Sequence, residues 1–133
     1  MGRVLVVEDS RDMRDMLAIA LEESGMEVTT AADGRAALGE LCRSQEQERP
    51  FDVMLLDISM PFIDGWEVLA AVRAHPVWRH LPVIALTGQA TRPVDRSRLR
   101  GLDAVYSDKG PGFLDFVVAM TERLMPGARY ATP

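Results

Sequence analysis

The stretch FDVMLLD at residues 51–57 decides the fold, because it is short, almost wholly apolar and ends in a carboxylate. A run of this kind is typical of a strand that is buried on both faces of a parallel sheet. Working outward, four further runs of strand character occur at residues 3–8, 27–31, 82–87 and 104–108. A helical pattern follows each of them. This alternation predicts an α/β domain of (βα)5 type, a doubly wound five-stranded parallel sheet with helices on both faces.

The segments between the strands carry apolar residues at helical spacing. Side chains that recur at i, i+3, i+4 and i+7 form one stripe of a helix, which we expect to face the core. Ser10 and Asp64 stand where each can cap the helix that follows. The residues expected to face inward are Met13, Met16, Leu17, Ala20 and Leu21 in the first helix, Ala37, Leu38, Leu41 and Cys42 in the second, Val68, Leu69 and Val72 in the third, and Phe113, Phe116, Val117, Met120 and Leu124 in the last.

Length and composition indicate one cytoplasmic domain. The 133 residues are 47% hydrophobic and 26% charged, which is enough for one core. We expect this domain at residues 1–125, followed by a polar tail or linker start at 126–133. No apolar run approaches the roughly 18–20 residues that cross a bilayer, and a single cysteine excludes an internal disulfide. The net charge of −5 argues against direct nucleic-acid binding. The sequence therefore predicts neither a membrane nor a nucleic-acid partner.

Chemically active side chains follow four of the five expected strands. Glu8 and Asp9 follow the first strand, Asp57 ends the third, Thr87 ends the fourth, and Lys109 comes just after the fifth. In an open parallel sheet, ligands bind outside the carboxyl ends of the strands. Lys109 is also the only lysine, since the other fourteen of the fifteen basic residues are arginines. We therefore expect these five side chains to converge on one rim of the sheet.

Three carboxylates on one rim repel one another unless a cation joins them. Oxygen ligands suit Mg²⁺, whereas Zn²⁺ would call for His or Cys, and neither His75 nor His80 follows a strand. Three carboxylates and one ammonium leave a formal charge of −2, which a divalent cation neutralises. A dianionic phosphoryl group is then tolerable beside Lys109, the metal and a hydroxyl donor. The rim thus predicts a Mg²⁺-dependent phosphoryl site.

Four segments together resemble one known family. They are VLVVEDS at 4–10, FDVMLLDISMPFIDG at 51–65, LPVIALTG at 81–88 and AVYSDKG at 104–110. In this order they are similar to the receiver domain of two-component response regulators, and DISMPFIDG fits the pattern D-x-x-M-P-x-x-D-G at every defined position. The resemblance covers residues 3 to about 125. It implies a flavodoxin-like, CheY-like fold with strand order 2-1-3-4-5.

The resemblance also implies roles for the acidic residues. Asp57 would be the phosphoacceptor, which forms an acyl phosphate by in-line attack on a phosphodonor. Asp9 would bind Mg²⁺ directly, Glu8 would act on the ion mainly through water, and the backbone carbonyl of Ser59 would be a further ligand. The function implied is a phosphoryl-accepting switch of a two-component phosphorelay that assists its own phosphorylation and dephosphorylation but is not an enzyme.

The remaining roles concern the readout. By the same resemblance, Thr87 would hydrogen-bond the phosphoryl oxygen, Lys109 would pair with the phosphoryl group, and Tyr106 would be the switch aromatic that turns inward on activation. The partners implied are a sensor histidine kinase or a histidine phosphotransfer protein. We expect a downstream protein partner to bind the face formed by residues 91–125. The cognate kinase, the output partner and the native context of the domain stay open.

Three other functions compete with the switch. The chain reads Lys109-Gly110-Pro111 where family members usually read Lys-Pro, which keeps open a degenerate receiver that binds proteins without phosphorylation. An aspartyl phosphatase of the haloacid-dehalogenase type usually carries a general acid two residues after its nucleophile, but here that residue is Ser59. A flavodoxin-like cofactor binder is disfavoured, because the acidic loop EDSRD at 8–12 would repel a flavin phosphate.

Overall fold

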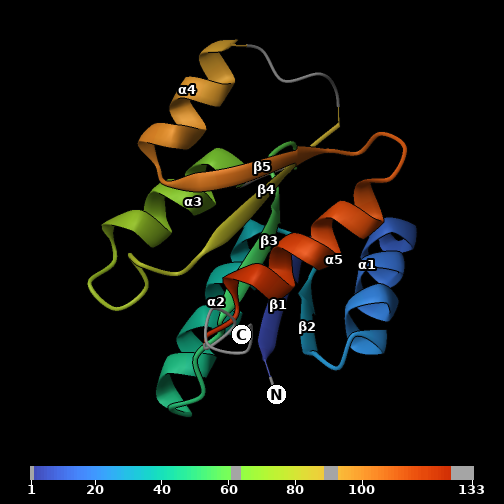
Figure 1. Cartoon of the computed structure of the whole chain (residues 1–133). Helices are drawn as coiled ribbons and strands as arrows, with labels where there is room; N and C mark the ends of the chain where they lie inside the picture. Colours follow the sequence, from blue (N-terminus) through green and yellow to red (C-terminus); the bar gives the residue numbers. More distant parts are fainter. Residues whose placement is uncertain (1, 61–63, 89–92, 127–133) are drawn as a thin grey trace, which may run out of the picture.

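The computed structural model describes residues 2–60, 64–88 and 93–126, and within them strands and helices alternate five times (Figure 1). Every expected strand is present, within two residues of the predicted bounds. The strands are β1 (Arg3–Val7), β2 (Glu27–Ala31), β3 (Val53–Asp57), β4 (Val83–Thr87) and β5 (Ala104–Asp108). The helices are α1 (Arg11–Glu23), α2 (Gly34–Glu46), α3 (Gly65–Ala74), α4 (Pro93–Gly101) and α5 (Phe113–Leu124). Residues 91 and 92 of the expected output face and 127–133 of the expected tail lie outside the described residues.

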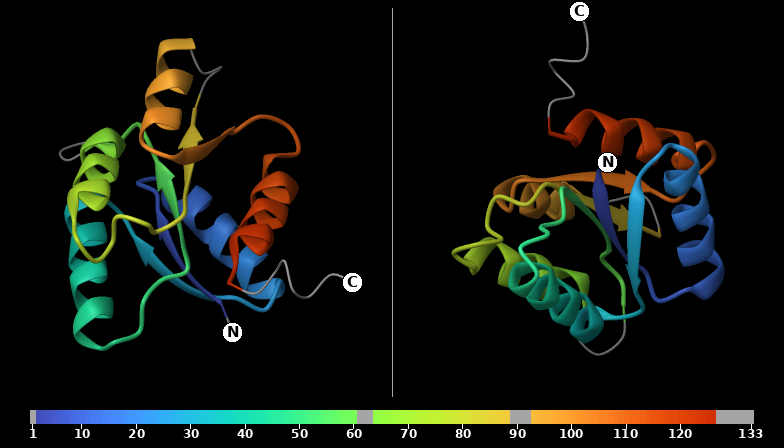
Figure 2. Two further views of the ribbon diagram at one scale, coloured as in Figure 1. Left: turned by 60° about the vertical axis from the view of Figure 1, so that its left-hand side comes forward. Right: turned by 90° about the horizontal axis from the view of Figure 1, so that it is seen from below.

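The five strands of the described chain form one parallel sheet in the order β2-β1-β3-β4-β5. Helices α1 and α5 cover one face of the sheet, and α2, α3 and α4 cover the other (Figure 2). This confirms the predicted doubly wound fold and the strand order implied by the resemblance. The order reverses direction at β1 and β3, so the rim between their carboxyl ends is the place where such folds bind ligands.

The position of β3 in the sheet accounts for the almost wholly apolar composition of residues 51–57. Every residue of β3 is buried, because β3 is the middle strand and both of its faces are covered. Neighbouring residues of one strand point to opposite faces. Leu5 and Val7 of β1 pack in the core beneath α2 and α3, whereas Val4 and Val6 pack in the core beneath α1 and α5. The sheet thus has two hydrophobic cores.

The predicted helix caps are present. The Ser10 hydroxyl accepts a hydrogen bond from the Met13 amide, and the Asp64 carboxylate accepts one from the Glu67 amide. These side-chain oxygens satisfy amides that have no partner within the helix. Asp64 is therefore the N-cap of α3, whose first residue is Gly65.

Three of the residues expected to face inward do not. Met16 and Phe116 are each 43% exposed, and Cys42 is exposed. The buried stripes are narrower than predicted, since α1 buries only Leu17 and Leu21 fully. Each of these three residues is the sequence neighbour of a fully buried helical residue, namely Leu17, Leu41 or Val117. Neighbouring residues of a helix point about 100° apart, so the three lie at the side of the buried stripe and not within it.

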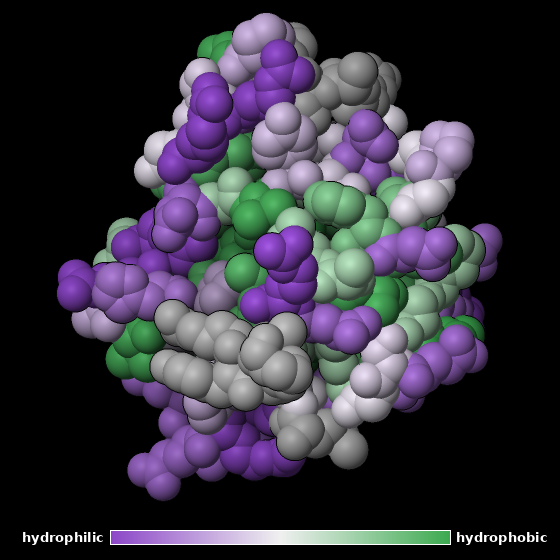
Figure 3. All heavy atoms as spheres, viewed as in Figure 1, coloured by the Kyte–Doolittle hydropathy of each residue, from purple (hydrophilic) through white to green (hydrophobic). Residues whose placement is uncertain are grey.

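The surface is hydrophilic over α4, at the top of the view in Figure 3. Arg98 of this helix lies over the Trp66 ring of α3, with 4.1 Å from the guanidinium carbon to the ring centroid. Near the end of α3, the Arg73 guanidinium donates to the carbonyls of Leu102 and Leu81, each at 2.7 Å. These contacts tie the α4–β5 turn to α3. No helix of the described chain is long and apolar enough to cross a membrane.

Candidate functional site

Three carboxylates meet at the rim where β1 and β3 end. Val7 of β1 pairs with Leu56 of β3, so the residues that follow, Glu8 and Asp57, lie side by side. One carboxylate oxygen from each of Glu8, Asp9 and Asp57 lies within 4.8 Å of the other two. Glu8 and Asp57 are buried and Asp9 is exposed. The sheet register thus brings together acids that are separated by almost fifty residues of sequence.

Lys109 reaches these acids from the loop after β5. Its ammonium lies 3.1 and 3.2 Å from the two carboxylate oxygens of Glu8 and 3.5 Å from Asp57 Oδ2. The Lys109 amide donates to the Thr87 carbonyl at 3.0 Å, which fixes the start of the loop. None of the described peptide bonds is cis. The Gly110 amide donates a hydrogen bond to Asp108 Oδ1 at 2.9 Å. The Lys-Gly order is therefore compatible with an ammonium that contacts both buried acids.

The environment of Asp57 disfavours its negative charge. Burial and, next, the neighbouring Glu8 carboxylate raise the pKa of Asp57 from 3.8 to about 7. Lys109 and the Ser59 amide, which donates to Asp57 Oδ1 at 3.0 Å, oppose this rise without cancelling it. Since one ammonium does not compensate two buried carboxylates, the site favours a further cation.

The donor set fits a hard divalent cation. Three carboxylates supply oxygen ligands, and one of them is exposed, so bound water can complete the coordination in the way that Mg²⁺ prefers. No histidine or cysteine belongs to the acidic cluster of the described residues, which argues against a zinc site. Ser59 follows Asp57 by two residues, and its amide is already oriented toward the Asp57 carboxylate.

Thr87 and Tyr106 lie on the two strands beyond β3. Asp57 pairs with Leu86, so Thr87 is the next residue of β4 along the rim. The Thr87 hydroxyl donates to the Ser107 carbonyl at 3.5 Å. Tyr106 pairs with Ala85 on the neighbouring strand and is half-buried against the core beneath α2, α3 and α4. Thr87 thus lies between the acids and the strand that carries Tyr106.

Gly65 is a residue of this site whose role the sequence reasoning missed. A Cβ at Gly65 would lie 2.3 Å from the Asp57 carbonyl oxygen and 2.4 Å from the Ile58 Cα. The Gly65 amide donates to the Ile58 carbonyl at 3.0 Å. The first turn of α3 therefore packs directly on the backbone that carries Asp57. The Asp-Gly pair at 64–65 is the sequence signal for this close approach.

Gly65→Ala is expected to lower the free energy of unfolding by about 1–3 kcal/mol, because the added methyl group must displace backbone rather than a flexible side chain. Gly39→Ala is a matched control in the interior of α2, since a Cβ at Gly39 would have no atom within 4 Å apart from its chain neighbours and the backbone of its own helix. The control should be neutral or stabilising by up to about 1 kcal/mol. Urea unfolding measures both. Equal effects of the two changes would contradict the close packing.

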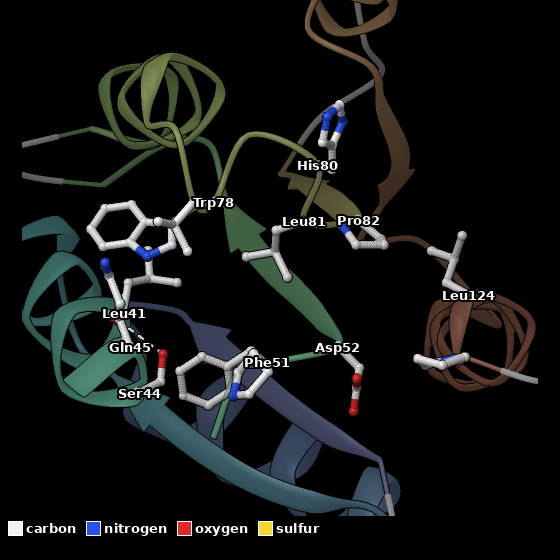
Figure 4. Close-up of a pocket in the computed structure, with 13 residues that line it drawn as sticks. Leu41, Ser44, Gln45, Phe51, Asp52, Trp78, His80, Leu81, Pro82 and Leu124 are labelled. Atoms are coloured by element: carbon white, nitrogen blue, oxygen red, sulfur yellow. Dashed lines mark hydrogen bonds between the residues drawn. The ribbon is translucent and has the colours of Figure 1, made fainter. Parts of the chain in front are cut away.

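A groove at the other end of the sheet is not part of this site (Figure 4). It has a volume of about 300 Å³ and is lined mainly by apolar side chains, among them Leu41, Phe51 and Trp78. Asp52 and Pro82, which line it, precede β3 and β4. The groove is therefore at the amino ends of the strands, opposite the carboxylates, and it holds no cluster of acids in the described residues.

Comparison with known proteins agrees with this geometry. A family model described as "Response regulator receiver domain" matches residues 4–106. The chain belongs to this family. Receiver domains are phosphoacceptor signalling modules that bind Mg²⁺ in an acidic pocket and interact with histidine kinases or phosphotransfer partners. The match confirms the family resemblance of the four sequence segments, and Lys109 lies just beyond the matched residues.

Three relatives of this receiver domain illustrate the similarity. The transcriptional regulatory protein TcrA of Mycobacterium tuberculosis is 41% identical over 106 residues, which are 80% of this chain and 38% of TcrA. The chain thus spans about two fifths of the length of that relative. The chemotaxis protein CheY4 of Vibrio cholerae is 32% identical, with a TM-score of 0.79 over 94% of this chain and 99% of CheY4. The phosphorylated cyanobacterial phytochrome response regulator RcpA is 26% identical, with a TM-score of 0.81 over 92% of this chain and 93% of RcpA.

Proposed function

We propose that Asp57 is the residue of this receiver domain that accepts the phosphoryl group. The observation that carries the proposal is the contact of one ammonium, Lys109, with Glu8 and Asp57 at a rim that also holds Asp9. A carboxylate oxygen of Asp57 attacks the phosphorus of the donor in line, a P–O bond forms, and the bond to the leaving group breaks. Water later hydrolyses the acyl phosphate and returns the carboxylate and inorganic phosphate.

Mg²⁺ would be held by Glu8, Asp9, Asp57 and the backbone carbonyl of Ser59. When bound, the ion supplies charge neutralisation at the transferring phosphoryl group. Lys109 has a separate task. Its ammonium, now 3.5 Å from Asp57, pairs with the phosphoryl oxygens that Asp57 acquires. The ammonium already contacts the free carboxylate, so its contribution to transfer would come from the added contacts to the phosphoryl oxygens, which form only in the transition state and the product.

The readout of phosphorylation is assigned to Thr87 and Tyr106. The Thr87 hydroxyl would turn toward the phosphoryl oxygens and leave the Ser107 carbonyl, which its 3.5 Å separation makes a weak partner. The Tyr106 side chain on β5, which is half-buried against the core, would move inward in response. Phosphorylation then shifts the population of two states, since its contacts favour one of them.

In this proposal the domain works in the cytoplasm, where a sensor histidine kinase or a histidine phosphotransfer protein would donate the phosphoryl group. A downstream protein would bind the face formed by residues 91–125. Exposed Val94 of α4 and Phe116 of α5 support such a face. Within the described residues, the contacts of Lys109 support the phosphorylated switch over a degenerate receiver, because they preserve the charge arrangement despite Gly110.

Incubation with Mg²⁺ and acetyl phosphate tests this function. The intact mass of the wild-type chain should rise by one phosphoryl group, and the rise should be absent in Asp57→Asn and in the presence of EDTA. Asp12→Asn is a matched control, because Asp12 is an exposed acid on α1. It should be phosphorylated like the wild type. A wild-type chain that gains no mass would contradict the proposal, as would turnover of an external phosphoester, which marks an enzyme.

A further inference from the structure

Arg14 lies outside the proposed site but contacts the backbone of two residues whose carboxylates belong to that site, Glu8 and Asp9. Arg14 lies on α1, four residues after the N-cap Ser10. Its guanidinium Nη1 donates to the Glu8 carbonyl at 2.9 Å and approaches the Asp9 carbonyl at 3.4 Å. The half-buried Arg14 side chain therefore contacts the main chain of two of the three rim acids.

Glu8 and Asp9 lie between β1 and α1 along the chain, so their carbonyls belong to neither the sheet nor the helix. The Glu8 amide still bonds to the Ala31 carbonyl of β2, and the helix begins with the bond from the Arg14 amide to the Ser10 carbonyl. Among the described residues, no backbone amide donates to the carbonyl of Glu8 or of Asp9. Glu8 is 1% exposed, so water has little access to this residue. A buried carbonyl without a donor is costly, and the Arg14 guanidinium supplies the donor.

We propose that Arg14 is a positioning residue for the divalent-cation site. By holding both carbonyls it fixes the backbone at Glu8 and Asp9, and with it the directions in which the two carboxylates point. This inference rests on the proposed function, because it assigns to Arg14 a role in binding the cation that the acids would hold. Groups that orient metal ligands from outside the coordination sphere typically change metal affinity by about 10–100-fold.

The sign of the effect separates positioning from simple charge. A cation near an acidic site repels a second cation, so removal of a positive charge alone should strengthen Mg²⁺ binding. Loss of a positioning contact should weaken it. Arg11 offers the comparison within the same helix, since its side chain is 85% exposed and its only described ion pair is with Asp15 at 4.0 Å. Arg11→Met thus removes a charge from the same end of α1 without touching the two carbonyls.

The experiment is a calorimetric Mg²⁺ titration of the full chain in four forms, namely wild type, Arg14→Met, Arg14→Lys and Arg11→Met. Arg14→Met should raise the Kd for Mg²⁺ about tenfold. Arg14→Lys keeps a long cationic donor and should restore the Kd to within about threefold of wild type. Arg11→Met should leave the Kd unchanged or lower it. If Arg14→Met does not fold, all four forms are compared in the Gly39→Ala background.

A second readout distinguishes positioning from general destabilisation. At saturating Mg²⁺, the rate of phosphorylation by acetyl phosphate should stay within about twofold of wild type in Arg14→Met, whereas the Mg²⁺ concentration that gives half of this rate should rise with the Kd. An unchanged or lower Kd in Arg14→Met would overturn the inference. A wild-type chain that binds no Mg²⁺ would overturn the proposed function instead, so the two failures are distinguishable.

Discussion

Lys109→Met is expected to slow phosphoryl uptake from acetyl phosphate by about a hundredfold at saturating Mg²⁺, because it removes the charge that, in our proposal, pairs with the transferring group. The same change should lower the free energy of unfolding in EDTA at pH 8 by about 2–3 kcal/mol. It leaves Glu8 and Asp57 buried without the ammonium that now lies 3.1 to 3.5 Å from them. Intact mass over time measures the uptake, and urea unfolding measures the stability.

Lys109→Arg is the matched control for this prediction. It retains the positive charge, so the free energy of unfolding should stay within about 1 kcal/mol of wild type. Phosphoryl uptake should still fall, since a planar guanidinium does not replace a compact ammonium at a site shaped for one. Uptake by Lys109→Met at the wild-type rate would mean that the ammonium has no part in the transfer.

The second large effect concerns the pH dependence of stability. The pKa of Asp57 is raised from 3.8, its ordinary value and the one expected in the unfolded chain, to about 7 in the folded protein. Between these values the folded state binds more protons than the unfolded state, so its stability falls as pH rises through this window. In EDTA, we expect this residue to lower the free energy of unfolding by on the order of 2 kcal/mol between pH 5 and pH 8.

Two comparisons isolate the contribution of Asp57. Asp57→Asn removes the titrating group, so its unfolding free energy should lose this part of the slope and exceed that of wild type at pH 8. In our proposal Mg²⁺ binds the ionised carboxylates, so it should stabilise wild type more at pH 8 than at pH 5. Thermal unfolding at several pH values, with and without Mg²⁺, gives both results. Equal slopes for wild type and Asp57→Asn in EDTA would show that the burial of this carboxylate carries no such cost.

Much of the fold follows from local pattern. The five strands were predictable because each is a short run that contains β-branched or other apolar residues. β3 stands out because burial on both faces leaves no place for alternating polar residues. The order of the strands was not predictable in this way, since alternation of strands and helices allows several orders, and it came from the family resemblance. The exposure of Met16, Cys42 and Phe116 was also missed, because neighbouring elements decide how wide a stripe each helix buries.

The candidate site divides in the same way. The residues at the strand ends were predictable, because parallel strands place their carboxyl ends on one rim. Which atoms meet there was not. The contact between Lys109 and Glu8 joins residues 101 positions apart, and it depends on the path of the loop after β5. The bonds of Arg14 to two carbonyls depend on how α1 leaves the sheet, which no pattern of residue types records.

Location of the phosphoryl group within the chain tests the central claim most directly. The wild-type protein is phosphorylated with acetyl phosphate and Mg²⁺, the acyl phosphate is trapped by borohydride reduction, and the modified peptide is sequenced by mass spectrometry. We predict modification at Asp57 and none at Glu8 or Asp9, the other two acids of the rim. Modification at another residue, or a wild-type chain that carries no acyl phosphate, would contradict the account.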